Sequence, residues 1–366
     1  MSRIDTRRRR WLQALAAAGA FPSLAALAAA ASADRPWRLA LAWSEEAPGA
    51  ERVQCTGVWQ QAGDRFEVAA RRVVPTRAHG LAQLPSGELL TVARRPGLWM
   101  QRWAADGTLR QEAWAEPGRQ FNGHVLPSAD GRVLYSTEQT HDGGAGCIAL
   151  RDPLTLALRD EWPTGGTDTH QLLRVGDQLF VANGGVPTRP ETGRAKLALP
   201  TMESSLVMFD LRSGQRHGPW RLDDPRLSLR HLAWHAPSGT LGIALQAEHD
   251  DPAQRAGAPL LALFDGEKLR AVPAPTDRPV AGAGYAGDIA ATPDGFVLSA
   301  SRAGALMGWS LRDGWTAPVP LAEACALATA AEVNTTCALG AERAWAGGRP
   351  MALPPGCKPD NHALIL

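Results

Sequence analysis

A short apolar strand, a turn containing Gly and a second apolar strand recur as one unit along the chain. The clearest copies open at five residues, which are His79, His124, His170, His231 and Asp288. A repeat of roughly 40 to 60 residues that is built only from strands is typical of a β-propeller. Propellers bring equivalent positions of distant blades together around one central channel. The sequence therefore predicts an all-β fold and also the place where a functional site would lie.

The repeat predicts a seven-bladed propeller over residues 34–366. A sixth, degenerate copy opens at Cys325. The seventh blade has to be divided between the two ends of the chain, and its inner strand would run from His362 to the C-terminus. Its three outer strands would open at Trp37, Arg52 and Arg65. Joining both ends inside one blade closes the ring and leaves no open sheet edge at the join.

Residues 1–33 have the pattern of a cleavable export signal. The arginines from Arg7 to Arg10 precede an Ala- and Leu-rich run that ends in Ala31-Ser32-Ala33. Paired arginines before Trp and Leu point to the twin-arginine route, with cleavage before Asp34. A membrane anchor is the alternative, but it needs about 20 predominantly apolar residues, and this run is only weakly hydrophobic. The mature protein is therefore expected in the periplasm and away from the membrane.

Charge and missing motifs argue against several classes of function. Without residues 1–33 the chain has 33 Lys and Arg against 36 Asp and Glu. A slightly acidic chain of this kind is not expected to bind nucleic acid or an anionic membrane. The chain contains no G-x-S-x-G, Walker loop, C-x-x-C-H or H-E-x-x-H motif. Hydrolase, ATPase, c-type cytochrome and zinc-protease activities therefore lack support. We also expect the protein to be a monomer.

All the cysteines lie beyond the signal, and they are Cys55, Cys147, Cys325, Cys337 and Cys357. Disulfides can persist in an oxidising compartment, and an odd number leaves at least one thiol free or available as a ligand. Cys325 and Cys337 flank a predicted hairpin. Cys55 and Cys357 could instead join the two ends of the chain. Spacing alone decides neither pairing.

The first residue of each predicted inner strand is a potential metal ligand. We expect these residues to meet at one mouth of the channel, and they are His79, His124, His170, His231, His362, Asp288 and Cys325. Neutral imidazole suits copper, zinc, iron and nickel, whereas calcium needs oxygen ligands. The second strands would return to the same mouth and place there Arg94, Glu138, Asn183 and Gln246. In the alternative, structural interpretation, each His caps its strand and bonds the backbone of the neighbouring blade.

Two insertions interrupt successive blades between the second and third strands. They cover residues 183–205 and 248–259. Long loops are usually functional or disordered, and loops at corresponding positions of two blades rise from the same face. The insertions therefore support a second hypothesis, in which the protein is an interaction scaffold that binds a partner through this face.

Several stretches of the chain resemble a bacterial family of exported proteins, the domain of unknown function 1513 family. These stretches are Gly123-His124, Ser128–Tyr135, Val181–Leu197, Ser228–Trp234 and Asp360–His362. The chain departs from the family at Ala198, where members tend to carry Asn, and in its degenerate sixth blade. The resemblance implies a seven-bladed, WD-repeat-like fold with no established activity. It also implies a setting near exported imelysin-like and di-haem proteins of iron uptake, which favours iron or copper and a periplasmic protein partner.

The leading hypothesis is a non-catalytic periplasmic propeller that binds iron, copper or a metal-bearing partner at the His-lined mouth. The interaction scaffold without a metal is the first alternative. The second alternative is an enzyme, either a metal-dependent oxidoreductase or a lactonase-like hydrolase. Lactonase propellers need an oxygen-rich calcium site, and the predicted ring has too few carboxylates for one.

Overall fold

The computed structural model describes residues 36–46, 52–141, 144–193, 195–196, 199–275, 283–330 and 335–366. Residues 1–33, the predicted export signal, lie outside the described residues. One compact unit spans Trp37–Leu366. Its described secondary structure is almost entirely β, as the repeat predicted. Within the described residues, no helix is long and apolar enough to cross a membrane.

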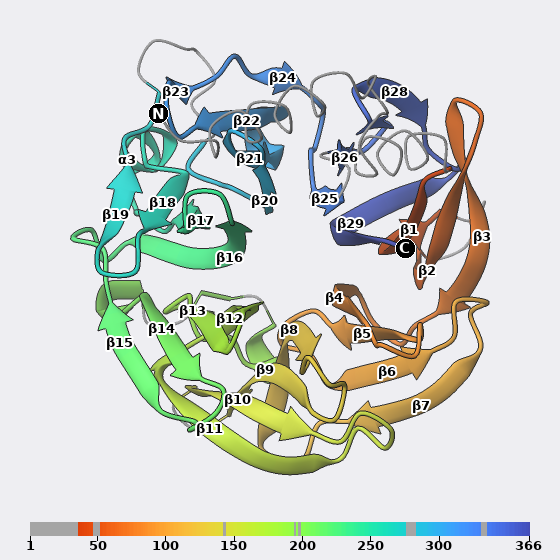
Figure 1. Cartoon of the computed structure of the whole chain (residues 1–366), viewed down its shortest axis with the longest axis horizontal. Coiled ribbons are helices and arrows are strands. Elements are labelled where there is room, and N and C mark those ends of the chain that lie inside the picture. The colour runs from red at the N-terminus through yellow and green to blue at the C-terminus, as the bar shows by residue number, and fades with distance from the viewer. Residues whose placement is uncertain are drawn as a thin grey trace, which may run out of the picture. The chain divides into compact units, whose positions relative to one another are not determined.

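The sheets of this unit follow one another along the chain, and each runs outward from an inner strand in the ring of Figure 1. The first contains β4 (Ala78–Gln83), β5 (Leu89–Ala93), β6 (Trp99–Trp103) and β7 (Leu109–Trp114). The second contains β8 (Arg119–Pro127), β9 (Leu134–Thr140), β10 (Ala145–Arg151) and β11 (Leu158–Thr167). The third contains β12 (Thr169–Val175), β13 (Gln178–Asn183), β14 (Ser205–Asp210) and β15 (Arg216–Trp220).

The next two sheets continue the same pattern. One contains β16 (Leu227–His235), β17 (Thr240–Ala247), β18 (Leu261–Phe264) and β19 (Leu269–Val272). The other contains β20 (Ile289–Thr292), β21 (Gly295–Ala300), β22 (Ala305–Ser310) and β23 (Gly314–Trp315), with β24 (Val319–Pro320) also paired to β22. Helical segments are short: η1 (Pro190–Thr192), η2 (Leu199–Thr201), α3 (Pro252–Ala256) and η3 (Ser301–Ala303).

The last sheet has eight strands and joins the two ends of the unit. One half contains β25 (Ala326–Ala330), β26 (Thr335–Leu339), β27 (Arg343–Ala346) and β28 (Arg349–Ala352). The other half contains β3 (Arg65–Val73), β2 (Val53–Ala62), β1 (Arg38–Glu45) and β29 (Cys357–Ile365), in that order. A single parallel bridge, between Ala352 and Arg65, connects the halves. The C-terminal strand β29 thus forms the inner edge of this second half, whose other three strands come from the N-terminal side.

Apolar side chains pack between neighbouring sheets and form the core. In β1, Leu41 and Trp43 are almost completely buried. The Trp43 ring lies 5.6 Å from that of Trp59 in β2, and Leu339 of β26 belongs to the same apolar cluster. Burial of apolar area contributes about 25 cal/mol per Å². The two halves of the eight-stranded sheet are therefore held together mainly by side chains, because only one backbone bridge connects them.

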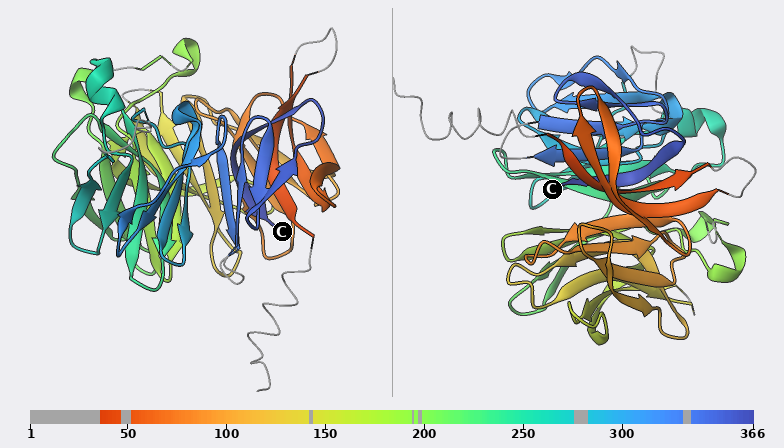
Figure 2. Two further views of the ribbon diagram at one scale, coloured as in Figure 1. Left: turned by 90° about the horizontal axis from the view of Figure 1, so that it is seen from above. Right: turned by 90° about the vertical axis from the view of Figure 1, so that its right-hand side faces the viewer.

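Both insertions lie between the second and third strands of their sheets, as the sequence predicted. The left view of Figure 2 shows η1, η2 and α3 projecting from the same face. An ion pair between Lys196 and Glu248 links the two insertions directly.

All five cysteines are free in the structure, so neither disulfide considered from the sequence forms. Cys337 lies opposite Ala328 in β25, which displaces it from Cys325 along the hairpin. Cys55 and Cys357 lie on strands to either side of β1. Two strand spacings of about 4.8 Å separate them, beyond the Cα distance of about 7 Å that a disulfide spans.

Removing residues 362–366 should destabilise the whole unit, because it deletes the partners of Leu39, Ala40 and Leu41 in the sheet. We expect the melting temperature to fall by about 10 °C or more, since each kcal/mol lost corresponds to about 2–4 °C in a large domain. Thermal unfolding followed by circular dichroism measures this change. The full-length His362→Ala variant is the control, because it removes one imidazole and keeps the strand. Equal melting temperatures for truncated and wild-type protein would contradict the role given to β29.

Candidate metal centre

Each histidine of the predicted ring lies in a β-bulge of an inner strand. The register with the second strand shifts around His79 in β4, His124 in β8, His170 in β12, His231 in β16 and His362 in β29. The inner strands β20 and β25 carry no histidine and pair without a shift. A bulge bends its strand and re-aims a side chain. The five imidazoles therefore turn toward the centre of the ring from inside their strands, and do not open the strands as the sequence predicted.

Two glycines allow the first two rings to approach each other. Gly123 has φ +102°, and a Cβ atom there would lie 2.8 Å from Cδ2 of His79. A Cβ atom on Gly80 would collide with the carbonyl oxygen of Gly123. Glycine tolerates both the positive φ and the close backbone contact. The sequences His79-Gly80 and Gly123-His124 therefore serve to bring β4 and β8 together at the centre.

The five imidazole rings form one cluster. Ring centroids lie between 4.4 Å (His231 to His362) and 5.9 Å (His79 to His231) in the nine pairs that are in contact. One potential ligand atom from each of His79, His124, His231 and His362 lies within 4.8 Å of the other three. Nε2 of His231 lies 3.1 Å from Nε2 of His170 and 3.1 Å from Nε2 of His362. We call these five residues the histidine cluster.

Four imidazoles of the cluster are buried, and burial favours their neutral form. His79, His124, His170 and His231 are between 1% and 6% exposed. Burial is the main cause that holds the pKa of each of these four imidazoles well below its usual range, and neighbouring imidazoles and arginines lower each pKa further. A neutral imidazole has a lone pair on one ring nitrogen, and this is the form that binds a metal.

Several buried ring nitrogens of the cluster have no hydrogen-bond partner within the described part of the protein. They are both nitrogens of His79, Nε2 of His124, Nδ1 of His170 and Nδ1 of His231. A buried polar group without a partner costs about 1–3 kcal/mol, and such groups in native proteins call for an explanation such as a bound ion. Strand capping through backbone hydrogen bonds, the structural alternative, does not account for these unpartnered atoms.

Asp288 and Cys325 lie outside the group of four potential ligands. The carboxylate of Asp288 lies 3.2 Å from Nδ1 of His362, on the side of the ring away from Nε2. The Cys325 thiol faces the carbonyl oxygens of Leu339 and Pro359. Burial raises the pKa of this thiol, which keeps it protonated. The structure thus brings the five imidazoles together, places Asp288 against the ring of His362, and directs the Cys325 thiol to backbone carbonyl oxygens.

The residues expected at the mouth have separate roles in the structure. Glu138 is fully buried and accepts hydrogen bonds from the guanidinium of Arg151. Asn183 is held by side-chain hydrogen bonds within its own sheet. Gln246 donates to the carbonyl oxygen of Ala286. Of these four residues, Arg94 acts on the cluster electrostatically, since its charge lowers the pKa of His79 and His231.

A charged layer lies beside the cluster, and sequence spacing alone did not predict its geometry. Asp168 is fully buried, accepts hydrogen bonds from Arg95 and Arg230, and lies 3.9 Å from Nδ1 of His170. Arg95 also donates to the carbonyl oxygen of Val186 in the first insertion, at 2.9 Å. The adjacent pairs Arg94-Arg95 and Arg230-His231 were the available signal. Their contacts connect residues far apart in the chain, so spacing could not reveal them.

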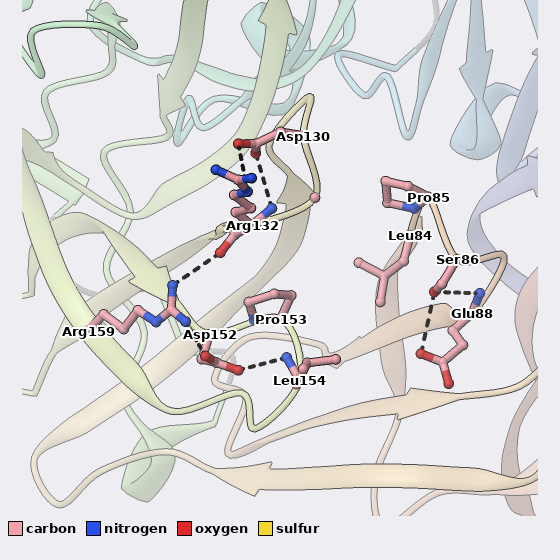
Figure 3. Close-up of a pocket in the computed structure, with 11 residues that line it drawn as sticks. Leu84, Pro85, Ser86, Glu88, Asp130, Arg132, Asp152, Pro153, Leu154 and Arg159 are labelled. Carbon is pink, nitrogen blue, oxygen red and sulfur yellow. Dashed lines mark hydrogen bonds and ion pairs between the residues drawn. The ribbon is translucent and has the colours of Figure 1, made fainter.

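A surface groove lies between turns of the first two sheets, and Figure 3 shows its lining. Leu84, Pro85 and Leu154 contribute apolar surface, and Arg159 forms an ion pair with Asp152 at its edge. None of the five histidines lines this groove. It is therefore separate from the candidate centre.

Comparisons with known proteins identify a family and a fold. The family described as "Protein of unknown function (DUF1513)" matches residues 72–366. The structure of apo AztD from Citrobacter koseri is similar, with 11% identity, a TM-score of 0.53 and coverage of 90% of this chain and 98% of that one. A candidate 6-phosphogluconolactonase from Bacteroides fragilis has 12% identity, a TM-score of 0.56 and coverage of 92% and 99%. At these identities the likeness concerns the fold alone. No curated protein matches the sequence.

The metal-free protein should lose stability as the pH falls through the ordinary histidine range. Four imidazoles with a lowered pKa in the fold take up protons on unfolding below about pH 6.5, the unfolded value. The contribution of these imidazoles to the free energy of unfolding is complete above that pH. Below it, each imidazole lowers the free energy of unfolding by up to about 1.4 kcal/mol per pH unit. Urea unfolding of chelator-treated protein between about pH 8 and pH 5 measures the slope. A His231→Leu variant should show a shallower slope. A flat wild-type profile would contradict the neutral cluster.

Proposed function

The chain belongs to the DUF1513 family, as its sequence indicated, and we propose that its function is to bind one transition-metal ion, iron or copper, at the histidine cluster. His79, His124, His231 and His362 would be the ligands, because they form the compact group of four. His170, whose Nε2 lies 3.1 Å from that of His231, would complete the site. The role is binding without catalysis.

The spacing of three nitrogen atoms carries this proposal. Nε2 of His231 lies 3.1 Å from Nε2 of both His170 and His362. Nitrogen ligands about 2.1 Å from one ion lie about 3.0 Å apart at a right angle and about 3.4 Å apart at the tetrahedral angle. Each nitrogen of a neutral imidazole has either one hydrogen or one lone pair. Nε2 of His231 therefore cannot make good hydrogen bonds to both His170 and His362. A metal ion that accepts the Nε2 lone pairs of His170, His231 and His362 would remove the need for these two hydrogen bonds.

The donor set selects the class of metal. Imidazole nitrogen suits iron, copper, nickel and zinc, whereas calcium and magnesium need oxygen ligands. The group of four contains no carboxylate, so it does not fit the oxygen-rich calcium centre of a lactonase propeller. Among divalent ions, copper binds nitrogen sites most tightly. Binding of iron in place of copper would depend on which ion is supplied in the compartment where the protein folds.

Further parts of the proposal concern the whole chain. The eight-stranded sheet is best counted as two blades, because only the bridge between Ala352 and Arg65 joins its halves; this makes seven blades over residues 34–366. Residues 1–33 would direct export by the twin-arginine route, and the mature protein would be a periplasmic monomer. Since that route carries folded proteins, the ion could be loaded before export.

An interaction scaffold is the second candidate function. The ion pair between Lys196 and Glu248 joins the two insertions on one face, and Thr188 in the first insertion accepts hydrogen bonds from Gln120 and Gln139 through its carbonyl oxygen. An ordered rim of this kind suits a periplasmic partner, including a metal-bearing protein of iron uptake.

The metal test compares the wild type with a double variant, His124→Ala with His231→Ala. Protein purified from metal-replete cells should contain close to one equivalent of iron or copper, and the double variant should contain almost none. A free ion concentration about 100 times Kd should raise the free energy of unfolding of the wild type by about 2.7 kcal/mol. The same ion concentration should leave the free energy of unfolding of the double variant unchanged. Elemental analysis and thermal unfolding measure both effects.

The exposed residue His217 supplies the matched control, because it lies on the outer strand β15. The His217→Ala variant should retain the wild-type metal content. Folded wild-type protein that takes up neither iron nor copper, before or after addition of the ion, would end the proposal and leave the scaffold as the remaining candidate.

A further inference from the structure

Asp288 and His362 form a carboxylate–imidazole pair at the edge of the histidine cluster. Oδ1 of Asp288 lies 3.2 Å from Nδ1 of His362, and both side chains are largely buried. The Nε2 atom of the same ring lies 3.1 Å from Nε2 of His231. The ring of His362 therefore has one nitrogen on the carboxylate and the other directed into the cluster.

The carboxylate of Asp288 is fixed by backbone groups of two sheets. The N–H of Ile289 donates to Oδ1 and the N–H of Leu327 donates to Oδ2, each at 2.9 Å. Asn361, the neighbour of His362, donates from its side chain to the carbonyl oxygen of Gly287 at 3.2 Å. These contacts hold β29 and the start of β20 in one register. The position of Asp288 relative to His362 is therefore set by the backbone, because the Asp288 side chain is short and both of its oxygens are held by backbone N–H groups.

Hydrogen-bond chemistry assigns the proton on His362. A carboxylate accepts hydrogen bonds and has no hydrogen to donate, so the nitrogen that faces it carries the hydrogen. Nε2 then carries the lone pair, which is the form that a metal ion binds. Histidine ligands commonly have such a carboxylate behind the ring, and it fixes both tautomer and orientation.

The other four histidines lack this arrangement among the described residues. Asp168 comes nearest, but it lies 3.9 Å from Nδ1 of His170, beyond hydrogen-bond distance. No carboxylate in the described part of the chain lies at hydrogen-bond distance from the rings of His79, His124 or His231. Within the described part of the chain, His362 is thus the one ring of the cluster with a carboxylate at hydrogen-bond distance.

We propose that Asp288 is a positioning residue: it holds His362 as the Nδ1–H tautomer and thereby directs the Nε2 lone pair into the cluster. This assignment replaces the sequence-based expectation that Asp288 is itself a ligand. The positioning role deepens the proposed function. Only its effect on metal binding rests on the proposed function. The tautomer of the metal-free protein is a property of the pair alone.

The first experiment measures the tautomer by long-range ¹H–¹⁵N NMR on metal-free protein with ¹⁵N-labelled histidine. Wild-type His362 should carry its hydrogen on Nδ1, and Asp288→Ala should release the ring to a mixture or to the Nε2–H form. Asp168→Asn is the matched control, because it removes a buried charge beside the cluster without touching His362. A wild-type His362 with its hydrogen on Nε2, or an unchanged tautomer in Asp288→Ala, would overturn the proposal.

The second experiment measures copper affinity by competition with a chelator. Asp288→Ala should bind copper about 10–100-fold more weakly, the usual cost of losing a partner behind a ligating ring. A purely structural role predicts a lower melting temperature in Asp288→Ala with wild-type copper affinity in the folded protein, and that result would overturn the proposal.

The two proposals fail separately. If the wild type binds no metal but its His362 carries the Nδ1 hydrogen and Asp288→Ala loses it, the positioning role stands and the proposed function falls. If the wild type binds copper and Asp288→Ala binds it equally well, the proposed function stands and the positioning role falls.

Discussion

The structure depends on how five imidazoles, four of them buried with a lowered pKa, are accommodated together at the centre of the ring. Several of their ring nitrogens have no hydrogen-bond partner within the described part of the protein, and a buried polar group left without any partner costs about 1–3 kcal/mol. A native fold keeps such a cost only where another interaction offsets it. The bulges and the two glycines at Gly80 and Gly123 all act to bring these rings together. This convergence makes little sense as packing alone, because apolar side chains would fill the same space without unsatisfied atoms.

Ring closure and completion of the site are the same structural event. His362 lies on β29, the last strand, which pairs with β1 near the start of the compact unit. Asp288, which faces His362, also accepts a hydrogen bond from Leu327 in β25. The cluster therefore forms only when the ends of the unit come together. A bound ion would in turn stabilise the closed ring, because binding to the native state alone adds to its stability.

The sequence predicted the all-β class, the pairing of insertions with particular strands and the identity of the five clustered histidines, because a strand repeat places equivalent residues at equivalent radii. It missed the bulges, which depend on how strands crowd at the centre. It also did not predict that Asp288 lies against Nδ1 of His362, because that contact joins residues far apart in the chain. Glu138 was expected at the mouth but lies in a buried ion pair with Arg151, a contact that local spacing cannot reveal.

A crystal structure of natively exported protein, with anomalous diffraction recorded at the iron and copper edges, tests the central claim most directly. The account predicts a single strong peak inside the histidine cluster, about 2.1 Å from ring nitrogens of at least His79, His124, His231 and His362. A cluster that holds only water, with every orphan nitrogen hydrogen-bonded to it and no anomalous peak, would contradict the account.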